Sequence, residues 1–138
     1  MEKIKKYKYK IFLVFFVIGL IISLILTFAN QNQLCSNSRC NLVLSSKYAS
    51  LLGVKNSFYG AIIFAALSII TFFQIRKPSK NKENLIKYSL IASSLISLYF
   101  LYLQQFILKA YCPYCLIVNI SNLINLIILI LACQTWKR

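Results

Sequence analysis

Four long runs of apolar residues, separated by polar or basic stretches, dominate the chain. They cover residues of about 11–29, 58–75, 88–108 and 112–134. Each run is close to the ~20 residues with which a helix crosses a hydrocarbon layer of about 30 Å. Because backbone polar groups must be satisfied within the segment inside a bilayer, such runs form helices. The pattern predicts an all-α integral membrane protein, a bundle of four transmembrane helices.

Composition supports this prediction and limits what else the chain can contain. Of the 138 residues, 59% are hydrophobic, whereas soluble domains are about 45–50% apolar. Little sequence lies outside the four runs, so residues 1–138 are expected to form a single membrane domain without a separate soluble part.

The segment between the first two runs, residues 30–57, is the longest connection. Apolar residues recur in it at helical spacing: Leu44, Tyr48, Leu51 and Leu52. This spacing predicts a short amphipathic helix at the membrane surface, with Gly53 as its stop. Such a helix would cover one end of the bundle and leave a hydrophobic pocket beneath it.

Small residues repeat every three or four positions on the first two runs. They are Gly19, Ser23 and Thr27 on the first, and Ser57, Ala61, Ala65 and Ser68 on the second. Since small side chains let membrane helices approach closely, these stripes predict packing seams.

The net charge of +14 is distributed unevenly. Twelve of the sixteen basic residues lie before the first run, in and beside the connection 76–87, or at the C-terminus. Short loops rich in Lys and Arg remain in the cytoplasm. We therefore expect both termini and the loop 76–87 to be cytoplasmic, and the loop 30–57 and the turn 109–111 to face outward. We therefore attribute the positive charge to the orientation of the chain in the membrane and not to nucleic-acid binding.

A cleaved signal peptide is an alternative interpretation of the first run, with cleavage near Ala29. The apolar stretch is longer than the usual 7–15 residues of a signal peptide. Its removal would leave three spans and an outward N-terminus, against the lysine pattern.

Four cysteines carry the candidate chemistry, and both pairs fall on the predicted outer side. Cys35 and Cys40 lie in the first loop, and Cys112 and Cys115 form a Cys-Pro-Tyr-Cys motif at the start of the last run. A CxxC motif is typical of redox or metal chemistry. Helix N-termini lower thiol pKa, which favours a thiolate at Cys112. Cys115 lies about 4.5 Å further along the helix.

These positions suggest different partners for the four thiols. Cys112 is placed to meet another protein thiol, and Cys115 to meet a molecule dissolved in the membrane. The stretch 36–39 between Cys35 and Cys40 is polar and has no apolar anchor. It predicts a mobile disulfide that exchanges with an external partner and with Cys112. A quinone, which is lipid-soluble and accepts two electrons, suits the last step.

Other interpretations of the cysteines remain open at this point. Four cysteines can hold a structural zinc, or form two inert disulfides. Cys133 lies about 27 Å down an ideal helix from Cys115 and cannot join either pair. The chain has no His, and its two acids, Glu2 and Glu83, fall in cytoplasmic segments. Acid–base hydrolysis on the outer side therefore lacks side chains.

Two asparagines lie on the same helical face as Cys112 and Cys115. Asn119 and Asn122 follow Cys115 at helical spacing. Polar residues in a membrane helix normally face the bundle interior or a ligand. They either bond neighbouring helices or contact the polar head of a lipid-soluble molecule beside Cys115.

Taken together, these motifs resemble the vitamin K epoxide reductase family in its small bacterial form. The resemblance rests on Cys35, the segment from Cys40 to Tyr48 (CNLVLSSKY), the segment from Asn56 to Gly60 (NSFYG), and the CPYC motif. It implies a four-helix oxidoreductase that uses a quinone, menaquinone or ubiquinone, and no metal. No thioredoxin-like domain is fused, so the resemblance implies a separate thioredoxin-like partner, a DsbA-type thiol oxidase that is secreted or periplasmic.

The resemblance also implies roles for individual residues. Cys35 would exchange with the partner, Cys40 would pass the disulfide to Cys112, and Cys115 would react with the quinone. Ser46 matches the loop serine or threonine of the family, and Asn56 its quinone-contacting asparagine. Asn119 stands where the animal enzymes carry a tyrosine, which favours a simple quinone over an epoxide.

The expected function is therefore a quinone-linked membrane thiol–disulfide oxidoreductase that drives disulfide formation outside the cytoplasm. The DsbB family performs similar chemistry but carries its two cysteine pairs in the reverse order. A non-catalytic membrane assembly protein with structural disulfides is another alternative. An outward electron transporter would need a redox centre at the inner face, where only Cys133 lies.

Overall fold

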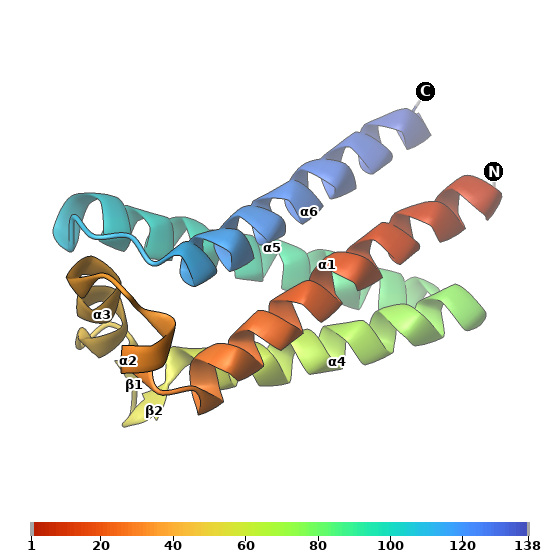
Figure 1. Cartoon of the computed structure of the whole chain (residues 1–138). Coiled ribbons are helices and arrows are strands. Elements are labelled where there is room, and N and C mark those ends of the chain that lie inside the picture. The colour runs from red at the N-terminus through yellow and green to blue at the C-terminus, as the bar shows by residue number, and fades with distance from the viewer. Residues whose placement is uncertain (1, 138) are drawn as a thin grey trace.

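Four long helices form the body of the protein (Figure 1). The computed structural model describes residues 2–137, and the side chains of residues 6–30 and 33–133. The long helices are α1 (Glu2–Phe28), α4 (Asn56–Arg76), α5 (Lys80–Tyr102) and α6 (Pro113–Lys137), and α5 continues into a π-helical turn, η1 (Leu103–Ile107). All four contain a stretch long and apolar enough to cross a membrane. The predicted all-α bundle of four membrane helices is confirmed.

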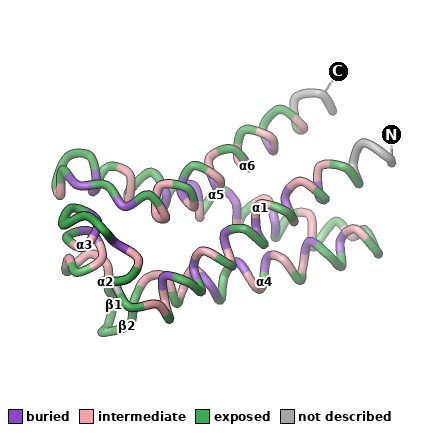
Figure 2. Tube along the Cα trace, viewed as in Figure 1, coloured by how far each residue is buried: buried purple, intermediate pink, exposed green. Residues whose placement is uncertain are grey.

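A few positions per helix are buried, and most are half-buried or exposed (Figure 2). Many of the exposed side chains are large and apolar. Large side chains such as Val14, Ile62, Leu95 and Ile127 are more than half exposed. Contiguous apolar surface of this extent is unfavourable in water. It fits a lipid environment, in which helices associate through packing and interhelical hydrogen bonds.

Small residues allow α1 and α4 to approach closely. A Cβ atom added at Gly19 would lie 3.0 Å from the ring of Phe64, and one at Gly60 would lie 3.3 Å from Ser23 Oγ. Further along, the Thr27 hydroxyl donates a hydrogen bond to Ser57 Oγ at 3.1 Å. The small-residue stripe predicted on the first helix is therefore its packing seam against α4.

The loop after α1 folds differently from the prediction. It contains α2 (Gln31–Leu34), α3 (Ser38–Ser45) and a two-stranded antiparallel hairpin, β1 (Ser50–Leu51) and β2 (Val54–Lys55). The amphipathic helix placed over 44–52 is wrong in position, because the helix of this loop ends at Ser45. Leu52 and Gly53 both have positive φ, 54° and 81°. Two such residues in succession form the tight turn of a hairpin and cannot continue a helix.

Both chain ends lie at one end of the bundle, and α2, α3 and the hairpin lie at the other (Figure 1). The non-helical segment that precedes α6 returns to the same end as this loop. Both cysteine pairs are therefore at the end opposite to the termini.

Candidate functional site

A disulfide joins Cys35 to Cys40. Both residues are buried, with 6% and 4% of their surface exposed, and they pack in one cluster with Val43, Ala110 and Cys112. The pair that was predicted to be mobile therefore has apolar neighbours to anchor it. The two half-cystines are apolar and face inward, whereas the polar residues 36–39 between them stay exposed.

The CxxC motif stands where α6 begins. Cys112 is fully buried and precedes Pro113, the first residue of the helix. Proline fits this position because its missing N–H would have no partner in the first turn. The backbone N–H of Cys115 points to Cys112 Sγ at 3.5 Å, and neither thiol is in a disulfide. The structure thus shows a closed loop disulfide beside an open dithiol.

The surroundings of Cys112 favour its thiolate. A hydrogen bond from the Cys115 thiol, followed by the backbone N–H groups of Cys115 and Tyr114, lowers the pKa of Cys112 to about 7. Burial opposes this shift. Since the thiolate is the nucleophile in disulfide exchange, Cys112 is prepared to attack near neutral pH.

A titration measures this pKa. In protein with Cys35, Cys40 and Cys133 replaced by serine, thiolate absorbance of reduced Cys112 should rise with a midpoint of about 7. The rate of thiol–disulfide exchange by Cys112 should rise over the same pH interval, because the thiolate forms there. Adding Cys115→Ala removes the largest cause, so the midpoint should move up toward the ordinary thiol value of about 8.5. The same midpoint with and without Cys115 would contradict this assignment.

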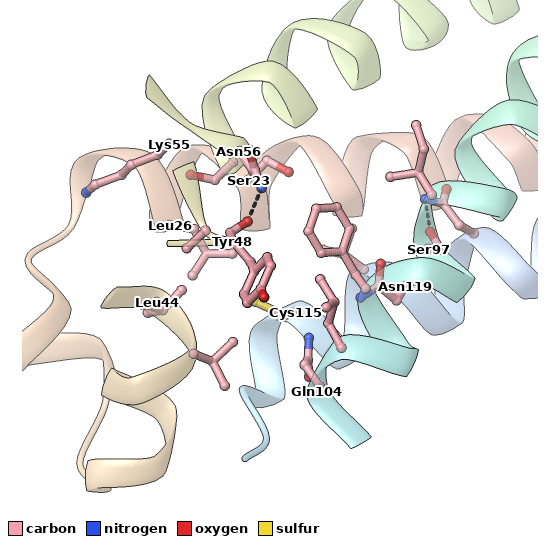
Figure 3. Close-up of a pocket in the computed structure, with 18 of the residues that line it drawn as sticks. Ser23, Leu26, Leu44, Tyr48, Lys55, Asn56, Ser97, Gln104, Cys115 and Asn119 are labelled. Carbon is pink, nitrogen blue, oxygen red and sulfur yellow. Dashed lines mark hydrogen bonds between the residues drawn. The ribbon is translucent and has the colours of Figure 1, made fainter. Parts of the chain in front are cut away.

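A pocket of about 200 Å³ opens between the loop and the helices. Its walls are mostly apolar and come from the ends of α1, α4, α5 and α6, with α3 and the turn after it. Figure 3 shows Cys115 on this pocket, together with Tyr48, Asn56 and Asn119. Cys115 lines the pocket but Cys112 does not. The two thiols of the motif therefore face different surroundings, Cys112 the loop disulfide and Cys115 the apolar cavity.

The pocket is lined by the polar residues that were predicted from the sequence. Asn56, Ser46 and Asn119 all line it. Asn56 Nδ2 donates to the carbonyl oxygen of Tyr48 at 2.7 Å, and Ser46 Oγ donates to that of Val43 at 2.9 Å. Both bonds hold the loop in its turn over the pocket. Asn56 is the first residue of α4, whose N-cap position is Lys55, and its side chain bonds the loop and lines the pocket.

Asn122, the other asparagine predicted on the same helical face as Cys115, also lines the pocket. Asn122 Nδ2 donates to Ser97 Oγ at 3.0 Å, which ties α6 to α5. Cys133 is an exposed free thiol on the terminal half of α6. In the part of the chain with described side chains, no group of three or more His, Cys, Asp or Glu side chains could hold a metal ion.

Tyr48 and Gln104 are among the pocket residues that were not assigned to the site from the sequence. Tyr48 was assigned to an amphipathic helix, and Gln104 falls inside an apolar run. A glutamine in a membrane helix is a signal that was available, since such residues normally face the interior. The tyrosine gave no comparable signal.

The fold and the site define a class of protein: a membrane helix bundle that holds a disulfide, a dithiol and an apolar pocket in contact. The chain belongs to the vitamin K epoxide reductase family, whose sequence profile matches residues 10–130. A search of curated proteins found no significant match to the chain. Members of the family are membrane thiol–disulfide oxidoreductases, generally associated with quinones and thioredoxin-like partners. The DsbB arrangement is therefore set aside.

Proposed function

We propose that this protein transfers electrons from a separate thioredoxin-like partner to a membrane quinone, and so generates disulfides outside the cytoplasm. The observation that carries the proposal is the division between Cys112 and Cys115. Cys112 packs with the loop disulfide, and Cys115 faces the apolar pocket. A relay between a protein thiol and a lipid-soluble acceptor needs this arrangement.

Each step of the proposed relay is a two-electron exchange. The partner dithiol reduces the Cys35–Cys40 disulfide and leaves as a disulfide. The Cys40 thiolate then attacks Cys112 in an oxidised Cys112–Cys115 pair and releases Cys115. Attack of Cys35 on Cys40 restores the loop disulfide and releases Cys112. The reduced pair finally gives two electrons and two protons to the quinone, which becomes a quinol.

The bonding state of the cysteines in the structure corresponds to one point in this relay. The loop disulfide is closed, and Cys112 and Cys115 are free. In the proposed order this is the state that precedes quinone reduction.

The size and lining of the pocket support a quinone ring as its occupant. Sites for whole drug-sized ligands measure about 300–1,000 Å³, and this pocket is smaller, at about 200 Å³. It suits a ring headgroup whose prenyl tail extends into the bilayer. Asn56, Ser46 and Asn119 are the proposed headgroup contacts, and the rings of menaquinone and ubiquinone are both candidates.

Quinol formation by the purified protein tests the function. Fully reduced protein, which carries two dithiols, should produce about two quinols per molecule from a short-chain ubiquinone without an added thiol, and many turnovers with excess dithiothreitol. Protein alkylated at its thiols is the control. Quinol formation at the rate of the alkylated control would reject the proposal.

The proposed orientation places the cysteine pairs outside. After reduction of intact cells with a membrane-impermeant phosphine, an impermeant maleimide should label Cys35 or Cys40 but not Cys133. The reason is the concentration of basic residues at the opposite end, which remains in the cytoplasm. Permeabilised cells, in which exposed Cys133 should react, provide the control. Labelling of Cys133 in intact cells would reverse the orientation.

A further inference from the structure

Two consecutive glutamines, Gln104 and Gln105, occupy the π-helical turn at the end of α5, and they have opposite environments. Gln104 is 4% exposed and lines the pocket. Gln105 is exposed, and its Oε1 accepts a hydrogen bond from the Tyr111 hydroxyl. The same residue type therefore occurs once on the pocket and once on the outer surface.

The π turn holds Gln104 in this position. The backbone N–H of Leu108 donates to the carbonyl of Leu103 at 2.8 Å, and that of Ala110 donates to the carbonyl of Gln104 at 3.2 Å. These bonds fix the backbone between α5 and the CxxC motif. Single π turns inside α-helices occur frequently at functional sites.

The side chain of Gln104 lacks a partner that its burial requires. Its Oε1 is buried and has no hydrogen-bond partner in the described part of the chain. Buried polar groups in native proteins are nearly always bonded, so such an atom calls for an explanation. In Figure 3 the Gln104 amide lies on the pocket below Cys115, with its nitrogen toward the cavity. A ligand in the pocket would be within reach of this amide.

We propose that Gln104 binds the redox-active oxygen of the quinone beside Cys115. This inference rests on the proposed function and adds a residue to the same site. A quinone oxygen only accepts hydrogen bonds, and Gln104 Nε2 donates to it. A quinol oxygen carries a hydroxyl, and Oε1 accepts from it after the amide rotates by half a turn. Glutamine has both groups, so one side chain serves substrate and product.

The redox step itself is unchanged by this assignment. The Cys112 and Cys115 thiols lose two electrons and two protons and form a disulfide, and the two quinone carbonyls become hydroxyls. Gln104 exchanges no electron or proton. It aligns one oxygen with Cys115 and bonds it in both redox states.

A purely structural role for Gln104 predicts a different result. If the amide only packs against α6, its replacement would lower stability with and without quinone alike. If it binds the headgroup, the quinone-dependent part of the stability would be lost.

Matched methionine variants separate these roles. Gln104→Met keeps the length of the side chain and removes its donor and acceptor, and Gln105→Met makes the same change on the exposed face. Binding is measured in detergent as the rise of Tm with short-chain ubiquinone and, separately, with its quinol. For Gln104→Met we expect binding of both forms to weaken about fivefold to tenfold, the factor that one hydrogen bond corresponds to. Gln105→Met should bind as the wild type does, and both variants should keep exchange of the Cys35–Cys40 disulfide with dithiothreitol.

The possible results of these binding measurements have different consequences for the role of Gln104 and for the proposed function. Equal binding by Gln104→Met and Gln105→Met would overturn the role of Gln104 and leave the proposed function intact. Wild-type protein that binds quinone without reducing it would reject the function, while weak binding by Gln104→Met would still support the contact. Wild-type protein that binds no quinone would reject both. Should Gln104→Met fail to fold, Gln104→Asn keeps the amide but withdraws it by one methylene, and wild-type binding by that variant would contradict the assignment.

Discussion

Cys115→Ala is expected to abolish quinone reduction and still to form a disulfide between Cys40 and Cys112. Cys115 is the thiol on the pocket, and without it the second thiol needed for a two-electron transfer is missing. Cys112 remains in the cluster with the loop disulfide. Its thiolate can attack Cys40, which forms a Cys40–Cys112 bond and releases the Cys35 thiolate. Without Cys115, only the return of the Cys35 thiolate to Cys40 breaks this bond, so the bond should be present in equilibrium with the loop disulfide.

The sequence allows the species with the Cys40–Cys112 bond to be identified directly. Arg39 lies between Cys35 and Cys40, so trypsin cleaves the chain between the two loop cysteines. Mass spectrometry under non-reducing conditions should find the peptide that begins at Cys40 linked to the one that contains Cys112. Cys133→Ala is the control, since this exposed thiol lies far along α6 and should leave both assays unchanged. Quinone reduction at the wild-type rate by Cys115→Ala would show that the assigned order of electron flow is wrong.

Asn56→Ala is expected to slow quinone reduction at least tenfold, with exchange of the Cys35–Cys40 disulfide retained. Asn56 lines the pocket, and one of its Nδ2 hydrogens bonds the Tyr48 carbonyl at 2.7 Å. The second hydrogen is the proposed donor to a quinone oxygen, which gains charge on reduction. Removal of one donor aimed at developing charge costs about 10²–10³ in rate in a dry site. The bond to Tyr48 also positions the loop over the pocket, so both losses act in the same direction.

Asn56→Ser distinguishes the contact from general loss of stability. Serine is shorter and reaches neither the Tyr48 carbonyl nor the pocket centre in the same way, so it should also reduce turnover. Steady-state rates per folded molecule and thermal unfolding are measured for both variants, together with dithiothreitol exchange of the loop disulfide. Lower stability with unchanged turnover in both variants would remove Asn56 from the site and leave it a structural residue of the loop.

The sequence was sufficient for the membrane architecture. Apolar runs determine where helices cross a bilayer because the requirement is local, a length of apolar residues with all backbone groups satisfied within the segment. The seam between α1 and α4 followed from the spacing of Gly19, Ser23 and Thr27. The position of the CxxC motif at the start of α6 and that of Asn119 on the same helical face were also predicted from the sequence. Asn56 and Ser46 were assigned to the site through the resemblance to the family.

Tertiary structure decided the loop and the inner surface of the pocket. Helical spacing of Leu44, Tyr48, Leu51 and Leu52 suggested a helix, but the positive φ of Leu52 and Gly53 turns the chain into a hairpin. The polar stretch between Cys35 and Cys40 suggested a mobile disulfide without an apolar anchor, but contacts with Ala110 and Cys112, distant in sequence, bury it. Gln104 and Gln105 are identical neighbours in the sequence, and only the π turn and the packing of α5 against α6 direct one into the pocket and the other outward. A local pattern states which residues are polar, whereas the face on which each one lies depends on backbone geometry and on partners that the chain supplies from elsewhere.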